Sequence, residues 1–239
     1  MSAEVTGERL TLGKSSQRNQ DDHVARYDFA SEFVSNDSVV LDVACGTGYG
    51  CAYLSDKGAK DIVGIDIDPE SIEYAKEHHS RLNISYLVGS ASDIKYPSNH
   101  FDCIVSFETI EHLETEDRGA YLRELKRVLK PGGVIIISTP NKKITSPWSK
   151  KPLNKFHILE FTQMQLESEL KNANINIKDR YGQRYVYKFF TMRLPYVLVR
   201  LIEKVLKHSF NIYDIADGPQ VKKYISHKIP RYFVFICSK

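Results

Sequence analysis

Short apolar runs alternate with amphipathic segments along the first two thirds of the chain. Between the runs, three segments have the spacing and the end signals of helices: CAYLSDKGA, SIEYAKEHHSRL after Asp68-Pro69, and AYLRELKRVL before Pro131-Gly132-Gly133. Near-continuous apolar strands that alternate with helices predict a mostly parallel sheet covered on both faces. The runs expected to form strands are VVLDV at 39–43, IVGIDI at 62–67, SYLV at 85–88, FDCIVS at 101–106 and VIIIS at 134–138.

The remaining chain continues the alternation less regularly. A basic, proline-containing loop at 142–155 is expected to cross the strand ends. It is followed by a predicted helix at 162–172 and predicted strands at 175–181 and 232–236.

A basic amphipathic helix is predicted at 189–210, between the last two strands. Residues 183–230 are therefore expected to form a helical insertion before the last strand, within a single domain that spans 1–239. Its role is open between packing, dimer formation, a substrate lid and contact with a membrane surface.

The composition is that of a soluble globular protein. Of 239 residues, 42% are hydrophobic and 26% are charged, which fits one domain and excludes a disordered chain, a collagen-like repeat or a small disulfide scaffold. The four cysteines are far apart and include no C-x-x-C, so neither a zinc site nor a disulfide framework is predicted. The N-terminal segment lacks an apolar core, and charged residues interrupt the longest apolar stretch, 194–206. We expect a cytoplasmic protein that spans no membrane and at most contacts the inner face of one.

Positive charge is concentrated in the last quarter of the sequence. The whole chain has a formal charge of +3, whereas residues 180–239 hold 12 lysines and arginines against 3 acidic residues. The same segment holds 12 of the 25 tyrosines and phenylalanines. This segment fits a basic, aromatic surface for an anionic partner, and it equally fits a solvated cationic face.

A glycine-rich turn follows the first strand. In VLDVACGTGYG, Asp42 ends the strand, and Gly46 and Gly48 let a ligand approach the backbone where the next helix begins. The glycines alone are a weak signal, because dinucleotide-binding folds use a similar turn. D-x-A-C-G-T-G resembles the first motif of the class I S-adenosylmethionine-dependent methyltransferases, with Ala44 at a position where glycine is usual. The resemblance covers residues 24–180 and implies an α/β, Rossmann-like domain with a seven-stranded, mostly parallel sheet, and S-adenosylmethionine as the methyl donor.

The resemblance assigns further residues to this cofactor. Asp66 resembles the acidic residue that holds both ribose hydroxyls, and a carboxylate can accept two such bonds. Ile67 is then expected against the adenine, beside a turn in which Ser90 stands where many members have aspartate, with Asp93 as a local substitute. Arg26 resembles an arginine that pairs with the methionine carboxylate, and a plain surface arginine is the alternative. The cofactor residues implied in this way are Arg26, Asp42, Ala44, Gly46, Gly48, Asp66, Ile67, Ser90, Ala91 and Phe107.

Methyl transfer makes modest chemical demands on a protein. The sulfonium is already activated, so an enzyme must align a nucleophile with the S–CH₃ bond and, for a hydroxyl, help to remove its proton. A general base or a metal ion can do the second. In SFETIEHL, a helix starting beyond the fourth strand would turn Glu108, Glu111 and His112 to one face near the carboxyl end of the sheet.

This E-x-x-E-H resembles the metal-binding segment of the small-RNA 3′-end 2′-O-methyltransferases, and a similar segment occurs in ubiquinone-biosynthesis O-methyltransferases. His157 in NKFHILEFT stands in a place comparable to a further histidine of the RNA enzymes. Glu108, Glu111, His112 and His157 would then bind Mg²⁺ or Mn²⁺ and leave positions for two substrate oxygens. The alternatives are His112 or His157 as a metal-free general base, and a purely structural role for these side chains.

Several acceptors are compatible with this interpretation. The stretch from FETIEHL to NKFHILEFT also resembles methyltransferases of bacterial cell-surface glycan biosynthesis, which implies O-methylation of a sugar or glycan precursor. An anionic acceptor, such as a phosphate-linked glycan, would meet the basic segment 180–239. A ubiquinone-type catechol ranks second, and an RNA 3′ end third, because no RNA-binding module is recognised. A non-catalytic binding protein remains a further alternative, and the oligomeric state is open.

Overall fold

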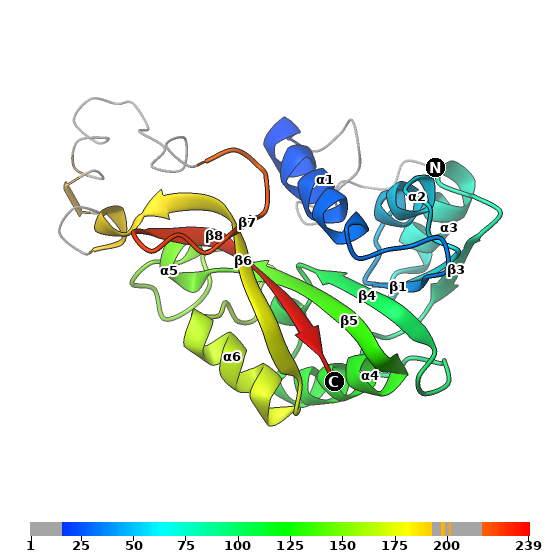
Figure 1. Ribbon diagram of the computed structural model, residues 1–239. Coiled ribbons are helices and arrows are strands. Elements are labelled where there is room, and N and C mark those ends of the chain that lie inside the picture. Colours follow the sequence, from blue (N-terminus) through cyan, green and yellow to red (C-terminus); the bar gives the residue numbers. More distant parts are fainter. Residues whose placement is uncertain (1–15, 193–196, 199–200, 202–216) are drawn as a thin grey trace.

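The computed structural model describes residues 16–192, 197–198, 201 and 217–239, and eight strands of this part form one sheet (Figure 1). The strands are β1 (Val39–Val43), β2 (Asp61–Asp66), β3 (Ile84–Val88), β4 (Phe101–Phe107), β5 (Leu129–Pro140), β6 (Asn176–Tyr187), β7 (Lys222–Lys223) and β8 (Lys228–Ser238). The helices are α1 (Gln17–Ser31), α2 (Tyr49–Asp56), α3 (Pro69–His78), α4 (Thr115–Val128), α5 (Lys142–Thr145) and α6 (Gln163–Asn172), with 3₁₀ turns η1 (Ile110–His112) and η2 (Lys188–Thr191).

The sheet has the order β3-β2-β1-β4-β5-β8-β6-β7. Its first five strands pair in parallel, and β8 then inserts antiparallel between β5 and β6. The expected α/β, Rossmann-like, mostly parallel sheet is confirmed. Within the described residues it has eight strands and not the expected seven, because the two-residue β7 pairs with β6 at the edge of the sheet. Because β1, β2, β4 and β5 run in the same direction, their carboxyl ends meet at one edge of the sheet, which is where ligands bind in folds of this kind.

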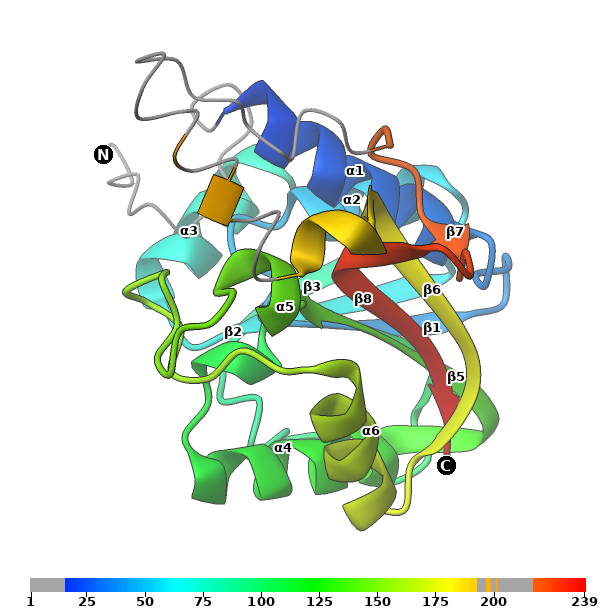
Figure 2. The same cartoon turned by 90° about the vertical axis from the view of Figure 1, so that its left-hand side faces the viewer.

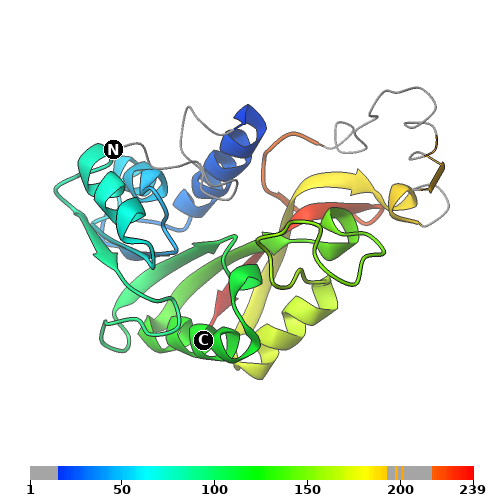
Figure 3. The same cartoon turned by 180° about the vertical axis from the view of Figure 1, so that it is seen from behind.

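Successive strand residues point to opposite layers of the core. In β4, Ile104 packs with α4 and α6, whereas Cys103 and Val105 pack with α1, α2 and α3. Figure 3 shows the same two layers of helices from behind, one on each face of the sheet. Since both faces are covered there, the central strands β1, β2 and β4 are apolar along most of their length, which is the pattern that the sequence displays.

The ends of two predicted helices differ from the structure. The helix predicted at 71–82 ends at His78, and Leu82 lies beyond it, fully exposed. The helix predicted at 120–129 begins at Thr115 and ends at Val128, so that Pro131-Gly132-Gly133 belongs to the first part of β5. There the register of β4 against β5 shifts, and Gly132 takes φ +83°, which glycine adopts without strain.

The two strands that flank the expected insertion are longer than predicted. β6 continues to Tyr187 and β8 begins at Lys228, so the two strands extend into the segment 183–230 from both sides. Most of the helix predicted at 189–210 lies outside the described residues. Within the described part of the chain, no helix is long and apolar enough to cross a bilayer.

Candidate active site

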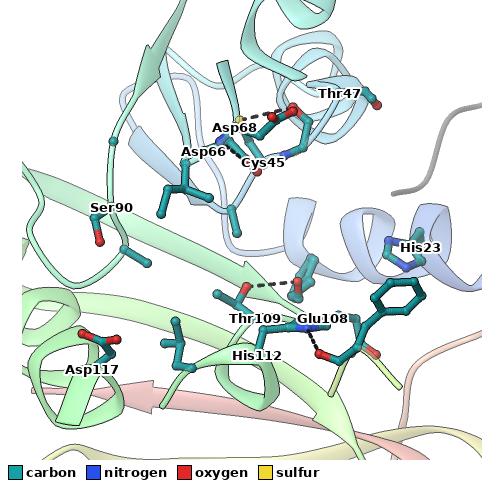
Figure 4. Close-up of a pocket in the computed structure, with 18 of the residues that line it drawn as sticks. His23, Cys45, Thr47, Asp66, Asp68, Ser90, Glu108, Thr109, His112 and Asp117 are labelled. Carbon is teal, nitrogen blue, oxygen red and sulfur yellow. Dashed lines mark hydrogen bonds between the residues drawn. The ribbon is translucent and has the colours of Figure 1, made fainter. Parts of the chain in front are cut away.

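Two cavities adjoin at the carboxyl edge of the parallel strands. The larger cavity, of about 650 Å³, is bounded by the glycine turn after β1 and by the ends of β2, β3 and β4 (Figure 4). The smaller cavity, of about 270 Å³, lies between α1, the segment after β5 and the start of β8. His23, Glu108 and His112 line both cavities, so a ligand in one can reach a ligand in the other.

The glycine turn has left-handed backbone at three positions, with φ +59° at Ala44, +53° at Gly46 and +80° at Gly48. Ala44 and Gly46 line the larger cavity, and a Cβ added to Gly46 would meet no atom within 4 Å. Gly48 does not line the cavity, because a Cβ there would point at α3 and come within 2.6 Å of the Cβ of Ala75. Gly46 therefore leaves room for a ligand, whereas Gly48 lets α2 pack closely on α3.

Asp66 ends β2 with its carboxylate at the wall of the larger cavity. Its Oδ2 accepts a hydrogen bond from the backbone N–H of Gly46 at 2.8 Å, and its Oδ1 accepts one from that of Asp68 at 2.9 Å. These two bonds fix the carboxylate and use one lone pair on each oxygen, so each oxygen retains a lone pair for a ligand hydroxyl.

Another part of the wall of the larger cavity is apolar. Ile67, Ala91 and Phe107 line it, and Ile67 is 75% exposed, which leaves its face available to a flat ligand such as an adenine ring. Ser90 also lines this cavity, with its Oγ 2.9 Å from that of Ser92. Asp93 does not line the cavity and pairs with Lys95, so the structure does not bring this carboxylate to the adenine position.

Asp42 lies beneath the glycine turn and is 1% exposed. Its carboxylate accepts hydrogen bonds from the hydroxyl of Tyr27 at 3.0 Å and from the thiol of Cys51 at 3.3 Å. Burial raises the pKa of Asp42 to about 7, although these two hydrogen bonds oppose the rise. The structure therefore places Asp42 as a support of the turn and not in the cavity wall.

Arg26 is also buried, at 1% exposure, so the alternative of a plain surface arginine is wrong. Its Nη1 donates to Oε1 of Gln183 at 2.6 Å, and its guanidinium lies over the ring of Tyr232, 5.0 Å from the centroid. Burial opposes its charge, but Glu108 and other anionic neighbours hold the pKa of Arg26 above its usual value. Arg26 lines neither cavity, and the Nε of Arg26 has no hydrogen-bond partner among the described residues.

The predicted helix over SFETIEHL does not form, because β4 ends at Phe107 and the next residue turns the chain. Glu108 has φ +52°, its N–H donates to the carbonyl of Ser138, and its Oε1 accepts from the hydroxyl of Ser138 at 2.7 Å. Only the 3₁₀ turn η1 follows. Glu108 is thus hydrogen-bonded to β5, and it does not share a helix face with Glu111 and His112.

Glu111 is fully buried and lines neither cavity. Its Oε2 accepts from the hydroxyl of Thr139 at 2.9 Å, whereas its Oε1 has no hydrogen-bond partner among the described residues. Burial, followed by the charge of Glu108, raises the pKa of Glu111 well above its usual value. An unpaired buried carboxyl oxygen of this kind calls for a cation, a water molecule or a proton.

The two predicted histidines do come together. The rings of His112 and His157 are nearly perpendicular, with centroids 5.0 Å apart. Nδ1 of His112 lies 3.1 Å from the carbonyl oxygen of Phe156. Because a carbonyl can only accept, Nδ1 donates, and the neutral ring carries its lone pair on Nε2.

A second set of hydrogen bonds orients His157. Its Nδ1 lies 2.9 Å from Oε1 of Glu160, and its Nε2 lies 3.0 Å from Nδ2 of Asn154. Oδ1 of Asn154 accepts the N–H of Phe156, so its Nδ2 is the donor toward Nε2 of His157. His157 therefore donates from Nδ1 to Glu160, and this carboxylate fixes its tautomer.

Glu111, His112 and His157 could hold a metal ion, since one ligand atom from each lies within 4.8 Å of the others. Glu108, the fourth expected ligand, does not belong to this cluster. One carboxylate and two imidazoles suit Mn²⁺, Fe²⁺ or Zn²⁺ better than Mg²⁺, which prefers oxygen ligands. The unpaired Oε1 of Glu111 and the carboxylate behind His157 both fit a metal site with an oriented second shell, in which the ion would replace Nδ2 of Asn154 as the partner of Nε2 of His157.

His23 is a site residue that the sequence interpretation missed. It lies on α1, lines both cavities, and its Nδ1 is 2.7 Å from the hydroxyl of Tyr49. Burial, followed by the charge of Arg26, lowers the pKa of His23 well below its usual value, so the ring is neutral at pH 7. The spacing of His23, Arg26 and Tyr27 on one helical turn was the available signal, but α1 itself was not predicted.

Comparisons with known proteins agree with this geometry. Residues 41–137 match the family model described as "Methyltransferase domain". A "Probable S-adenosylmethionine-dependent methyltransferase" of Mycolicibacterium smegmatis is 34% identical over 143 residues, which is 60% of this chain and 54% of that protein. The chain thus spans about half the length of this curated relative.

The names of two other relatives indicate that they methylate different atoms, nitrogen in one case and oxygen in the other. Phosphoethanolamine N-methyltransferase 3 of Arabidopsis thaliana is 39% identical over 101 residues, 41% of this chain and 20% of that protein. A ubiquinone biosynthesis O-methyltransferase of Bradyrhizobium diazoefficiens is 36% identical over 105 residues, 43% of this chain and 40% of that protein. The crystal structure of a TehB-like SAM-dependent methyltransferase from Corynebacterium glutamicum has the same fold, with a TM-score of 0.59 at 17% identity over 90% of this chain and 87% of that one.

Proposed function

Because the chain contains a class I S-adenosylmethionine-dependent methyltransferase domain, we propose that it transfers the methyl group of S-adenosylmethionine to a hydroxyl of a sugar or glycan precursor. The observation that carries this proposal is the pair of adjoining cavities, which differ in character and share His23, Glu108 and His112. One cavity suits the donor, and the other suits a polar acceptor.

The larger cavity is the proposed donor site. Adenosine needs a flat apolar wall and a hydrogen-bond acceptor for its ribose, and the exposed face of Ile67 and the carboxylate of Asp66 supply them. Room beside Gly46 allows the rest of the donor to pass close to the backbone. Its sulfonium methyl group would then point toward the side chains that line both cavities.

The smaller cavity is the proposed acceptor site, and its lining favours a hydroxyl-rich molecule over a catechol. Most of the side chains that line it can form hydrogen bonds, and its flat rings, those of Tyr232 and three histidines, all carry polar atoms, so an aromatic acceptor would find little apolar surface. Donors and acceptors both occur, which suits hydroxyl groups, since each hydroxyl both donates and accepts. The polar side chains that line this cavity are Asn19, Asp22, His23, Glu108, His112, Thr145, Asn154, His157, Glu160, Arg231 and Tyr232.

His112 is the proposed general base. As the acceptor oxygen attacks the methyl carbon, the O–C bond forms, the S–C bond breaks, and S-adenosylhomocysteine leaves as a neutral thioether. The hydroxyl proton goes to Nε2 of His112, and the carbonyl of Phe156 stabilises the resulting imidazolium through Nδ1. His157, oriented by Glu160, is the second candidate base, and it can accept a proton on Nε2 once Nδ2 of Asn154 moves away from that atom.

A metal-assisted form of the same reaction is the alternative, favoured by the unpaired Oε1 of Glu111. Glu111, His112 and His157 would hold a divalent cation, which when bound lowers the pKa of a coordinated hydroxyl. His112 would then be a ligand and not the base. Removal of metal by a chelator separates the two cases, because only the metal-assisted reaction stops.

A methyl-transfer assay tests the function. The protein is incubated with S-adenosylmethionine bearing a labelled methyl group and with nucleotide sugars, sugar phosphates, a catechol or an amine, and products are identified by mass spectrometry. We expect label on a sugar hydroxyl, together with S-adenosylhomocysteine. Label on the catechol or the amine, with none on any sugar, would overturn the choice of acceptor.

The His112→Ala variant tests the role of His112. We expect a 10²–10⁴-fold lower turnover with unchanged donor affinity, which is the range for loss of a general base. His78→Ala, which removes an exposed histidine on α3, is the matched control and should retain full activity. Full activity of the His112→Ala variant would show that His112 is not the general base.

A further inference from the structure

α5 and most of the segment that connects it to α6 expose both charge and apolar surface. Residues 142–158, which we call the basic loop, hold five lysines and no aspartate or glutamate. Four large apolar side chains in the basic loop are exposed: Trp148 at 62%, Leu153 at 65%, Phe156 at 40% and Ile158 at 43%. Exposed apolar side chains that gather in one segment mark an interaction surface more often than a plain solvent face.

The basic loop is held in shape by its own hydrogen bonds. The hydroxyl of Ser146 accepts from the N–H of Leu153 at 2.8 Å, and its carbonyl accepts from the N–H of Ser149. The hydroxyl of Ser149 in turn donates to the carbonyl of Lys151 at 2.6 Å. Trp148 lies at the centre of this turn with φ +63°, a conformation that is unfavourable for a bulky residue and that persists only where the surroundings impose it.

Four of the five lysines of the basic loop are available to an anionic surface. Lys143, Lys150, Lys151 and Lys155 are exposed, and the Nζ of Lys155 lies 4.8 Å from the ring centroid of Phe156. The first carboxylate after the loop, Glu160, is buried and bonded to His157 and Thr145, so it does not neutralise the surface charge.

We infer that the basic loop docks on an anionic lipid surface, with Trp148 and Leu153 entering the headgroup region and the lysines facing lipid phosphates. Tryptophan is enriched at membrane interfaces, and lysines near an anionic leaflet add binding free energy individually. A nucleic acid would use the lysines and the aromatic rings, but it offers nothing to Leu153 and Ile158. The aliphatic side chains therefore favour lipid.

This surface forms the rim of the active site. Phe156 lines the larger cavity, and Thr145, Asn154 and His157 line the smaller one. Figure 2 shows α5 and the chain that follows it on one side of the molecule, and β7 on another. Docking would thus bring the smaller cavity close to the lipid headgroups.

Trp148 is the only tryptophan of the chain, so its fluorescence reports directly on the basic loop. The protein is mixed with vesicles of phosphatidylcholine alone or with 30% phosphatidylglycerol, without methyl donor. We expect a blue shift of the emission and protection from acrylamide with the anionic vesicles only. Raising the salt concentration to 0.5 M should reduce binding, because it screens the lysines.

Two charge-reversal variants identify the residues involved, with binding measured by co-sedimentation. We expect Lys150→Glu/Lys151→Glu to weaken binding to the anionic vesicles at least about 30-fold, since each lysine contributes roughly a factor of five near such a surface. The matched control is Lys222→Glu/Lys223→Glu on β7, which makes the same charge change at exposed positions elsewhere. We expect the control to bind as the wild type does.

The outcomes separate the alternatives. Absence of a Trp148 shift with anionic vesicles overturns the inference, and so does an equal loss of binding in both double variants. Tight binding of a single-stranded RNA oligonucleotide that the Lys150/Lys151 variant alone loses, without vesicle binding, would assign the basic loop to nucleic acid. Because no donor or acceptor is present, none of these results depends on the proposed methyl transfer.

Discussion

At the scale of single residues, the proposed donor site depends on one carboxylate. Asp66 is held by the backbone N–H groups of Gly46 and Asp68 and faces the larger cavity. This arrangement ties the glycine turn to the end of β2, so the same side chain organises the cavity and faces its ligand. We therefore expect donor binding to depend on the charge of Asp66.

Replacing Asp66 by asparagine tests this dependence. The change keeps the size of the side chain but removes its charge, and hydrogen bonds to a charged group contribute about 1.5–3 kcal/mol. We expect the affinity for S-adenosylhomocysteine, measured by isothermal titration, to fall about 10–150-fold. Asp61→Asn, at the exposed start of the same strand, should have wild-type affinity, and equal affinities of the two variants would reject the role of Asp66.

Asp42 gives the stability of the protein a specific dependence on pH. Its pKa is about 7 in the folded state and near 3.8 when exposed, so between these values the folded state binds a proton that the unfolded state lacks. The stabilisation is full below about pH 4 and is lost as the pH rises through about 7. Compared with Asp42→Asn, the wild type should lose about 2–3 kcal/mol of unfolding free energy between pH 5 and pH 8.

Urea unfolding of both proteins at the two pH values measures this difference. The contributions of other groups, such as Glu160, whose pKa lies below its usual value, cancel in the comparison. Parallel pH profiles of the wild type and the Asp42→Asn variant would show that Asp42 is ionised throughout.

At the scale of elements, Gly46 and Gly48 of the same turn have different structural roles. A Cβ at Gly48 would collide with Ala75 and Tyr86 at 2.6–2.8 Å, whereas a Cβ at Gly46 would meet only the open cavity. Gly48→Ala combines left-handed backbone with overpacking, so we expect it to lower the unfolding free energy by about 2–5 kcal/mol.

Gly46→Ala should have a smaller effect on stability and a larger effect on donor binding. Its backbone strain costs about 1–2 kcal/mol of stability, but its methyl group enters the larger cavity and should weaken donor binding tenfold or more. Thermal unfolding and isothermal titration of both variants give the comparison. A Gly46→Ala variant that is less stable than Gly48→Ala would contradict the assignment.

The sequence predicts this part of the fold well because its signals are local. Apolar runs buried on both faces, the glycine turn and the residues at the strand ends are neighbours along the chain. The helix expected over Glu108 to His112 does not form for a non-local reason. Ser138 on β5 forms hydrogen bonds with both the backbone and the side chain of Glu108. The pairing of His157 with Glu160, three residues apart, was within reach of the sequence but was not recognised.

At the scale of the whole molecule, the smaller cavity is assembled from distant segments. Arg184 on β6 pairs with Asp22 on α1 at 2.6 Å, and Gln183 accepts from Arg26, so the first described helix is fastened to the antiparallel end of the sheet. Asn141 meets β8 through the carbonyl of Pro230. No spacing in the sequence connects these segments, which is why the lining of the smaller cavity was predicted less completely than that of the larger one.

The most direct test of the two-cavity account is a crystal structure of the protein with S-adenosylhomocysteine. We predict that the nucleoside fills the larger cavity, with its ribose hydroxyls bonded to Asp66, its adenine against Ile67, and its sulfur facing the side chains of His23 and His112. The smaller cavity should then lie beyond the sulfur, in line for an acceptor. A ligand bound elsewhere, or a sulfur that faces away from the smaller cavity, would contradict the account.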